Sequence, residues 1–345
     1  MIVRRHRYSI LRWISLAFIM AGLYLAACVP GTSAIATRPV TIPTADPSIP
    51  SIVDSQPVVT VQAPVTEFST SIPASPTFPP DPTAQESFRF AIIGDYGEGG
   101  KAEKDVADLV KSWNPDFIIT VGDNNYPDGA AETIDQNIGK FYHEYIYPYT
   151  GSFGDGADSN RFFPSLGNHD WTSDHAQPYL DYFTLPGNER YYDFLWGPAQ
   201  FFAIDSDPRE PDGVGKFSIQ AQWLQSGLAA SQSPWKLVYF HAPPFSSALH
   251  GSTDWMRWPF QEWGASAVFS GHDHVYEHLM VDGLPYFING LGGGAIYYFV
   301  NVLDTSQARF NDDWGAMLVT YDSQQITFQF ITRQGKIIDT YQLNR

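Results

Sequence analysis

The chain has 345 residues, of which 43% are hydrophobic and 15% aromatic, and its formal net charge is −17 at pH 7. This composition suits a globular domain, although the chain is longer than one compact core usually needs. The acidic surface repels polynucleotides and argues against a nucleic-acid partner. The single cysteine, Cys28, excludes an internal disulfide.

The first 27 residues are predicted to be an export signal. They include four arginines and no acidic residue, and the arginines precede an apolar run over residues 13–25 that is short for a membrane span. The run ends in Leu-Ala-Ala-Cys at 25–28, which resembles the bacterial lipobox, where the cysteine is lipidated and becomes the first mature residue. We therefore predict a lipoprotein on the extracytoplasmic face of a bacterial membrane, held there through the lipid anchor on Cys28 only. An uncleaved anchor helix and a plain signal peptide that leaves the protein secreted are the alternatives.

Residues 28–86 are predicted to be a disordered tether. Positions 29–86 hold 12 of the 26 prolines, with Thr and Ser between them and no helical or strand period. Such a segment cannot bury enough apolar surface to fold, and its prolines favour an extended chain. A passive spacer is the simpler interpretation, and a glycan-bearing stalk is the alternative.

Residues 87–345 are predicted to form one α/β domain. Short apolar runs alternate with helical patterns, which indicates a sheet covered by helices on both sides. The apolar runs cover residues 90–94, 117–122, 162–167, 237–241 and 267–271. The helical patterns cover residues 102–112, 132–145, 177–183 and 219–230. Residues 317–343 alternate as antiparallel strands do, with turns at Asp322-Ser323 and Gln334-Gly335.

Each of the five apolar runs ends in a short motif that carries polar side chains. The motifs are Gly-Asp-Tyr-Gly at 94–97, Gly-Asp-Asn-Asn-Tyr at 122–126, Gly-Asn-His-Asp at 167–170, Val-Tyr-Phe-His at 238–241 and Gly-His-Asp-His at 271–274. Ligand sites in α/β sheets lie beyond the carboxyl ends of strands, so we expect these motifs to converge. Carboxylates, a phenol, an amide and imidazoles together are the ligand mixture of a two-metal hydrolase.

The order and separation of the five motifs resemble those of the purple acid phosphatases, the binuclear branch of the calcineurin-like metallophosphoesterases. The resemblance covers about residues 88–294 and implies a four-layer α-β-β-α sandwich of two mixed sheets flanked by helices. It also implies two metal ions, held by ligands at seven positions. These positions are Asp95, Asp123, Tyr126, Asn168, His241, His272 and His274.

The family pattern divides the seven ligands between the two ions. Asp123 is expected to bridge them, because a carboxylate has two oxygens. Asp95, Tyr126 and His274 would complete the first ion. The remaining three ligands, Asn168, His241 and His272, would complete the second ion.

Tyr126 bears on the identity of the metals. A phenol has a pKa of ~10, so its binding as phenolate at acid or neutral pH requires a strongly acidic cation, and Fe(III) is the best candidate. The second ion is then Zn, Mn or Fe(II). The alternative is that Tyr126 only packs beside two divalent ions.

Two further histidines are candidate catalytic residues. His169 matches the Gly-Asn-His block of the family, where the histidine contacts the substrate phosphate, and Asp170 is expected to hold its other ring nitrogen. His250 lies on the proline-rich loop after His241 and is placed to protonate a leaving group. The alternative for His250 is a solvated loop residue.

The sequence therefore predicts a phosphatase that cleaves small phosphomonoesters by attack of a metal-bound hydroxide on phosphorus. A phosphodiesterase on the same fold is the nearest alternative, because the metal ligands alone do not separate the two ester classes. A noncatalytic binding lipoprotein of the cell envelope is a further alternative. Replaced ligands would favour it, and this sequence replaces none of the seven ligand positions. The oligomeric state is not indicated by any motif.

Overall fold

The computed structural model describes residues 86–345. The predictions for the signal peptide, for Cys28 and for nearly all of the tether lie outside the described residues. Within residues 86–345, none of the helices combines the length and the apolar character needed to cross a lipid bilayer.

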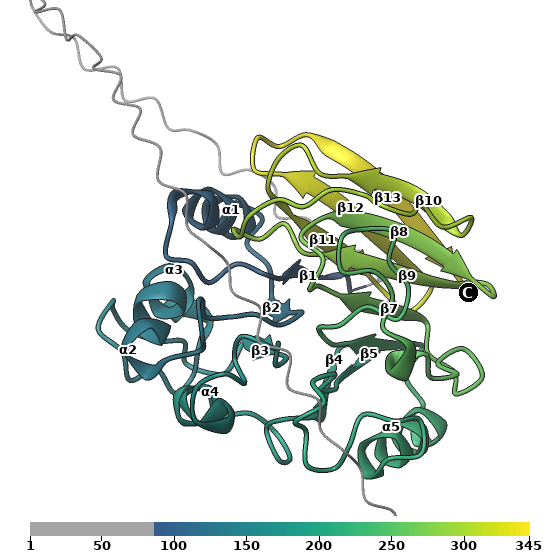
Figure 1. Ribbon diagram of the computed structural model, residues 1–345, viewed down its shortest axis with the longest axis horizontal. Helices are drawn as coiled ribbons and strands as arrows, with labels where there is room; N and C mark the ends of the chain where they lie inside the picture. Colours follow the sequence, from purple (N-terminus) through teal and green to yellow (C-terminus); the bar gives the residue numbers. More distant parts are fainter. Residues whose placement is uncertain (1–85) are drawn as a thin grey trace, which may run out of the picture. The chain divides into compact units, whose positions relative to one another are not determined.

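Two mixed sheets form the centre of the domain (Figure 1). The first has the strand order β13-β12-β11-β1-β2-β3 and the second β10-β8-β9-β7-β6-β5-β4. The strands of the first sheet are β1 (Phe88–Ile93), β2 (Phe117–Thr120), β3 (Phe162–Pro164), β11 (Gly315–Tyr321), β12 (Gln325–Thr332) and β13 (Ile337–Asn344). Those of the second are β4 (Tyr192–Trp196), β5 (Ala199–Ala203), β6 (Trp235–Tyr239), β7 (Ala267–Ser270), β8 (Tyr276–Val281), β9 (Leu284–Asn289) and β10 (Ser306–Phe310).

Parallel pairing is confined to the strands that lead into the predicted site and to β5 and β9. Strands β1, β2 and β3 are parallel, as are β5, β6, β7 and β9, and the other pairs are antiparallel. The carboxyl ends of parallel neighbours meet at the same edge of a sheet. The loops after β1, β2, β3, β6 and β7, which carry the five motifs, therefore start from common edges.

Helices complete the four layers. They are α1 (Lys101–Ser112), α2 (Ala131–Ile134), α3 (Lys140–Tyr142), α4 (Gln177–Tyr182) and α5 (Ile219–Ala230). Four further turns of π or 3-10 helix are η1 (Asp135–Gly139), η2 (His143–Tyr145), η3 (Asp174–Ala176) and η4 (Asp254–Met256). Two mixed sheets with flanking helices confirm the predicted fold class.

The apolar core has two clusters of buried side chains, and the two faces of a strand in the second sheet supply different clusters. On β5, Phe201 joins the cluster that lies between the sheets, whereas Phe202 joins the cluster beneath α5 with Leu224. Between the sheets, the ring of Phe201 meets the ring of Phe90 edge to face at 5.1 Å. Burial of one such side chain is worth about 1.5–3 kcal/mol, so this core fixes how the strand ends face each other.

The predicted helix over residues 132–145 is wrong in part. The segment is divided among α2, the π-helical turn η1, α3 and η2. The Asp135 carboxylate, in η1, accepts hydrogen bonds from the hydroxyls of Tyr149 at 2.6 Å and Tyr182 at 2.8 Å. A Cβ at Gly139 would overlap these groups, so the glycine leaves room for them where a regular helix would carry a side chain.

Candidate metal centre

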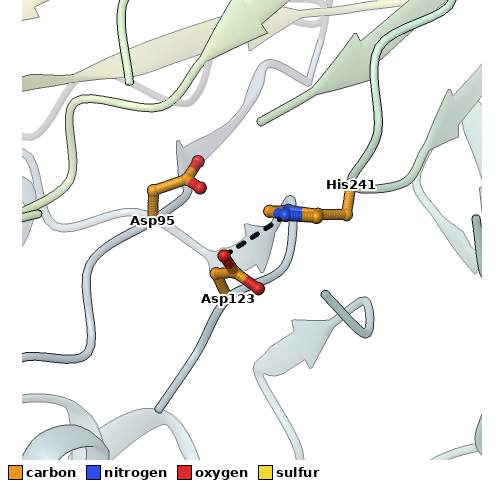
Figure 2. Close-up of side chains that lie close together, drawn as sticks. All are labelled: Asp95, Asp123 and His241. Carbon is orange, nitrogen blue, oxygen red and sulfur yellow. Dashed lines mark ion pairs between the residues drawn. The ribbon is translucent and has the colours of Figure 1, made fainter. Parts of the chain in front are cut away.

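The five motifs converge at the carboxyl ends of their strands. Among residues 86–345, ligand atoms of Asp95, Asp123 and His241 lie within 4.8 Å of one another, and all three residues are buried. Figure 2 shows the three side chains, which start from different loops and point toward a common centre. Asp95 follows β1, Asp123 follows β2 and His241 follows β6, so the cluster draws on both sheets.

The backbone at this centre is held in an unusual conformation. Asp95, Asp123 and His272 have φ angles of 54°, 52° and 67°, in the left-handed region that residues other than glycine seldom adopt. Each such residue costs of order 1–3 kcal/mol and persists only where its surroundings enforce it. A Cβ at Gly271 would overlap the Asp95 carboxylate, so the loops of the two sheets are in contact here. Strain of this kind is characteristic of functional sites.

The first group of donors surrounds the Tyr126 hydroxyl. This oxygen lies 3.4 Å from Asp95 Oδ1, 3.0 Å from Asp123 Oδ2 and 3.1 Å from His274 Nε2. His274 Nε2 lies in turn 3.3 Å from Asp95 Oδ1. The structure thus brings together the three side chains that were predicted to share one ion, with Asp123 beside them.

The second group surrounds His241. Its Nε2 atom lies 3.0 Å from Asn168 Oδ1, 3.2 Å from His272 Nδ1 and 3.3 Å from Asp123 Oδ2. The Oδ2 atom of Asp123 therefore lies within 3.3 Å of a donor from each group. All seven predicted ligands are brought together, and they fall into the two expected groups with Asp123 between them.

Backbone carbonyls orient two of the imidazoles. His241 Nδ1 lies 2.9 Å from the carbonyl oxygen of Val121, and His274 Nδ1 lies 2.6 Å from that of Ala295. A carbonyl only accepts, so each Nδ1 carries a proton, and once Nε2 is deprotonated each ring turns a lone pair toward the centre. This is the tautomer that can bind a metal ion.

The electrostatics of the centre also favour a cation. Burial raises the pKa of Tyr126 well above its usual value, and the charges of Asp123 and Asp95 raise it further. Burial opposes ionisation of Asp123, but attraction and a hydrogen bond to His241 hold the pKa of Asp123 below its usual range. Oxygen and nitrogen donors around two buried carboxylates fit a pair of metal ions, whose charge would offset that of the carboxylates and ionise the phenol.

His169 lies at the rim of the centre. Its backbone N–H donates to Asp123 Oδ1 at 2.9 Å, and its Nε2 lies 3.9 Å from Asp123 Oδ2. Its Nδ1 donates to the carbonyl oxygen of Pro127. The prediction that Asp170 holds this nitrogen is wrong. Asp170 instead accepts hydrogen bonds from the backbone N–H groups of Asn124 at 3.1 Å and Gly167 at 2.9 Å. Its carboxylate therefore points toward the interior and joins the loops after β2 and β3.

His250 is exposed to solvent and also contacts the centre. Its ring stacks on that of His272 with centroids 4.4 Å apart and meets the edge of Tyr297 at 5.3 Å. Its backbone N–H donates to Asp273 Oδ1 at 2.8 Å, and Ser246 Oγ donates to Asp273 Oδ2 at 2.5 Å. Asp273 therefore ties the His250 loop to the strand end that carries two of the ligands.

Sequence reasoning missed Tyr297, the anchoring role of Asp273 and a glycine run. Tyr297 stacks on His274 at 4.1 Å with an interplanar angle of 7°. A Cβ at Gly290 would overlap the Asp273 carbonyl, and one at Gly292 would overlap the Gly94 carbonyl. The run Gly-Leu-Gly-Gly-Gly at 290–294, directly after β9, was the available signal, because repeated glycines in and after a strand mark close backbone approach.

The chain is similar to proteins of one family. The family model described as calcineurin-like phosphoesterase matches residues 88–276. Tartrate-resistant acid phosphatase type 5 of Mus musculus is 27% identical over 252 residues, which is 62% of this chain and 73% of that protein. Purple acid phosphatase 7 of Arabidopsis thaliana is 24% identical over 293 residues, or 75% and 87% of the two chains.

One solved structure extends this likeness to the fold. The purple acid phosphatase PPD1 from yellow lupin seeds superimposes with a TM-score of 0.57 and 18% identity. The match covers 76% of this chain and 54% of that chain. At this level of identity, the likeness shows a shared fold.

Replacement of Asp123 by alanine should abolish tight metal binding, because Asp123 is the side chain that contacts both donor groups. Elemental analysis after equilibrium dialysis against metal should give about two ions for the wild type and fewer than one for Asp123→Ala. Asp304→Ala, which removes an exposed carboxylate, is the matched control and should keep wild-type stoichiometry. Two retained ions in folded Asp123→Ala would contradict the assignment.

Proposed function

The chain belongs to the calcineurin-like phosphoesterase family, and from this premise we propose that it is a metal-dependent phosphatase that hydrolyses phosphomonoesters at a binuclear centre. One observation carries the proposal: seven donor side chains from five loops form two groups that share Asp123. Retention of every donor argues against a noncatalytic binding protein. Purple and tartrate-resistant acid phosphatases among its relatives support a monoester substrate.

Two sets of residues would hold the metal ions. Asp95, Tyr126 and His274 would hold the first, and Asn168, His241 and His272 the second, with Asp123 shared. We assign Fe(III) to the first set, because only a strongly acidic cation offsets the burial and the two carboxylates that keep the Tyr126 phenol protonated. Zn, Mn or Fe(II) would fill the second. Such a pair, when bound, supplies a nucleophile from water at moderate pH and stabilises charge on the transferring phosphoryl group.

The protein's own residues then position the ester. With Nδ1 bound to the Pro127 carbonyl, His169 has Nε2 left to contact a phosphoryl oxygen. His250 would protonate the leaving oxygen, since its ring lies against His272 and neither of its nitrogens bonds to another group of residues 86–345. Asp273 and Ser246 hold this loop in place, which preserves the position of the proton donor.

We also propose that export and lipidation of Cys28 place this activity outside the cytoplasm. Detergent-phase partitioning of Cys28→Ser, which lacks the thiol that would be lipidated, would test the lipid anchor.

Hydrolysis of a monoester and a diester by the same metal-loaded protein tests the reaction class. We expect phenyl phosphate to be turned over at least ~100-fold faster, in kcat/KM, than diphenyl phosphate. Asp123→Ala, measured beside it, sets the background from contaminating phosphatases. Faster cleavage of the diester would replace the proposal with a phosphodiesterase, and no cleavage of either would overturn it.

Replacement of His250 by alanine should impair poor leaving groups most, because they depend on protonation as the ester bond breaks. General acid catalysis is worth roughly 10²–10⁴-fold, so ethyl phosphate should lose at least ~10-fold more kcat than nitrophenyl phosphate. His175→Ala, at an exposed histidine without an assigned role, is the control. Equal losses on both esters would assign His250 to phosphate binding or loop shape instead.

Replacement of Tyr126 by phenylalanine tests the ferric assignment. A phenolate bound to Fe(III) absorbs visible light, whereas the filled d shell of Zn(II) permits no such transition. We expect a purple or pink wild type and a bleached Tyr126→Phe variant that retains less iron, while the unchanged ring keeps the packing nearly intact. A colourless wild type with two zinc ions, after expression with iron supplied, would refute Fe(III) and leave the phosphatase proposal standing.

A further inference from the structure

A cavity of about 190 Å³ lies directly beside the second donor group. Three of its lining residues are the donors Asn168, His241 and His272. The rest of its wall comes from the loop after β5, from the segment between β6 and η4, and from η4 itself. These residues are Ser206, Asp207, Pro208, Ala242, Thr253 and Trp255. A substrate group that enters this cavity would therefore be attached to a phosphoryl group held at the donors.

The wall of the cavity offers apolar contact. The polar side chains of Ser206 and Asp207 already accept hydrogen bonds from other groups of the protein. Ser206 Oγ accepts from the Ala242 N–H at 2.8 Å, and both oxygens of Asp207 accept from Arg209 at 2.7 Å. Ser206 keeps only its O–H to donate, so a sugar or polyol would lose the hydration of several hydroxyls here and gain few partners from these two side chains, which is costly. Pro208, Ala242 and the Trp255 indole present carbon surfaces instead.

Trp255 is fixed in position although 47% of its surface is exposed. Its indole Nε1 donates to the Ser206 carbonyl at 3.1 Å, and its own carbonyl accepts from the indole of buried Trp258 at 2.9 Å. A large aromatic side chain held rigidly at the surface of a cavity is well suited to bind a ligand, because little conformational freedom is lost on contact.

The size of the cavity points to a single aromatic ring. Apolar cavities of ~150 Å³ bind benzene, and this cavity is slightly larger. The proton donor assigned above is also close, because His250 stacks on His272, which lines the cavity. An ester oxygen between a phosphoryl group at the donors and a ring in the cavity would lie within the reach of His250.

We propose that this cavity binds the aromatic leaving group of an aryl phosphomonoester and that Trp255 sets the preference for it. The inference rests on the proposed phosphatase function and adds a substrate class to it. In the reaction, water supplies the new oxygen on phosphorus, the bond from phosphorus to the aryl oxygen breaks, and the phenol leaves with a proton.

The test compares phenyl phosphate with ethyl phosphate in the metal-loaded full chain. Their kcat/KM ratio in a variant, divided by their ratio in the wild type, cancels the intrinsic difference between the two leaving groups. Trp255→Leu should lower this quotient about tenfold, because the lost contact between two aromatic rings contributes a factor of about that size to kcat/KM. Trp255→Phe, which keeps a ring, should restore most of it. Phe217→Leu is the matched control, because Phe217 is 80% exposed and does not line the cavity.

Binding of inert analogues gives a readout that is independent of turnover. Calorimetry should show tighter binding of phenylphosphonate than of methylphosphonate, and Trp255→Leu should remove the difference. Equal affinity for the two phosphonates in the wild type, or an unchanged quotient in Trp255→Leu, would overturn the aryl site while monoester hydrolysis stands. A wild type that hydrolyses neither ester would overturn the proposed function, and the phosphonate affinities would then decide the aryl site separately.

Discussion

Burial of the Asp95 and Asp123 carboxylates side by side is the constraint on which the rest of the site depends. Asp95 is fully buried and Asp123 is 2% exposed, so both have lost nearly all contact with water. Uncompensated charges in such a place are costly, and the chain supplies compensation from several loops. The backbone N–H of His272 donates to Asp95 at 3.0 Å, and that of His169 donates to Asp123 at 2.9 Å. The imidazoles face the same oxygens, and a metal pair would complete the balance.

The site was largely predictable because its residues are tied to strand ends, where sequence patterns are clear. Apolar runs in the sequence predict β1, β2, β3, β6 and β7, and each motif with predicted ligands directly follows its run. The two predictions that were wrong, the single helix over residues 132–145 and the contact of Asp170 with His169, depend on side chains that meet only after folding. The bonds of Asp135 to Tyr149 and Tyr182 that accompany the broken helix join residues from three separate segments. The partner of Asp170 could not be read from its neighbour His169, since its carboxylate turns toward Asn124 across another loop.

Other omissions had a signal that went unused. The hairpin of β8 and β9 turns at Asp282 and Gly283, which both have positive φ angles. An Asp-Gly pair between apolar runs is among the strongest hairpin signals in a sequence. The hairpin of β4 and β5 turns at Gly197, whose φ is 51°. These two hairpins add strands to the second sheet without contributing any of the seven donors, so they alter the fold more than the site.

The division of labour between core and loops bears on specificity. The strands fix the positions of the predicted metal ligands, and one fold can carry sites for different substrates. After His241, the segment between β6 and η4 contains none of the predicted metal ligands. It carries His250 and leads to Trp255, and hydrogen bonds from Ser246 to Asp273 and from Trp255 to Ser206 hold it in shape. Under the proposed function, changes in this segment would therefore alter which esters fit while the predicted metal ligands stay in place.

The pairing of β1 with β11 has a consequence for how the protein is made. Ile92 pairs with Met317, so the strand that leads into Asp95 is completed on one side by a segment more than two hundred residues further along the chain. While the chain emerges from its N-terminal end, the edge of β1 is exposed until β11 follows it. Contacts so distant in sequence form slowly, and an unpaired strand edge invites association with other chains. The newly made chain thus passes through a period in which its ligand loops exist but cannot be held together, and its dependence on chaperones should be greatest then.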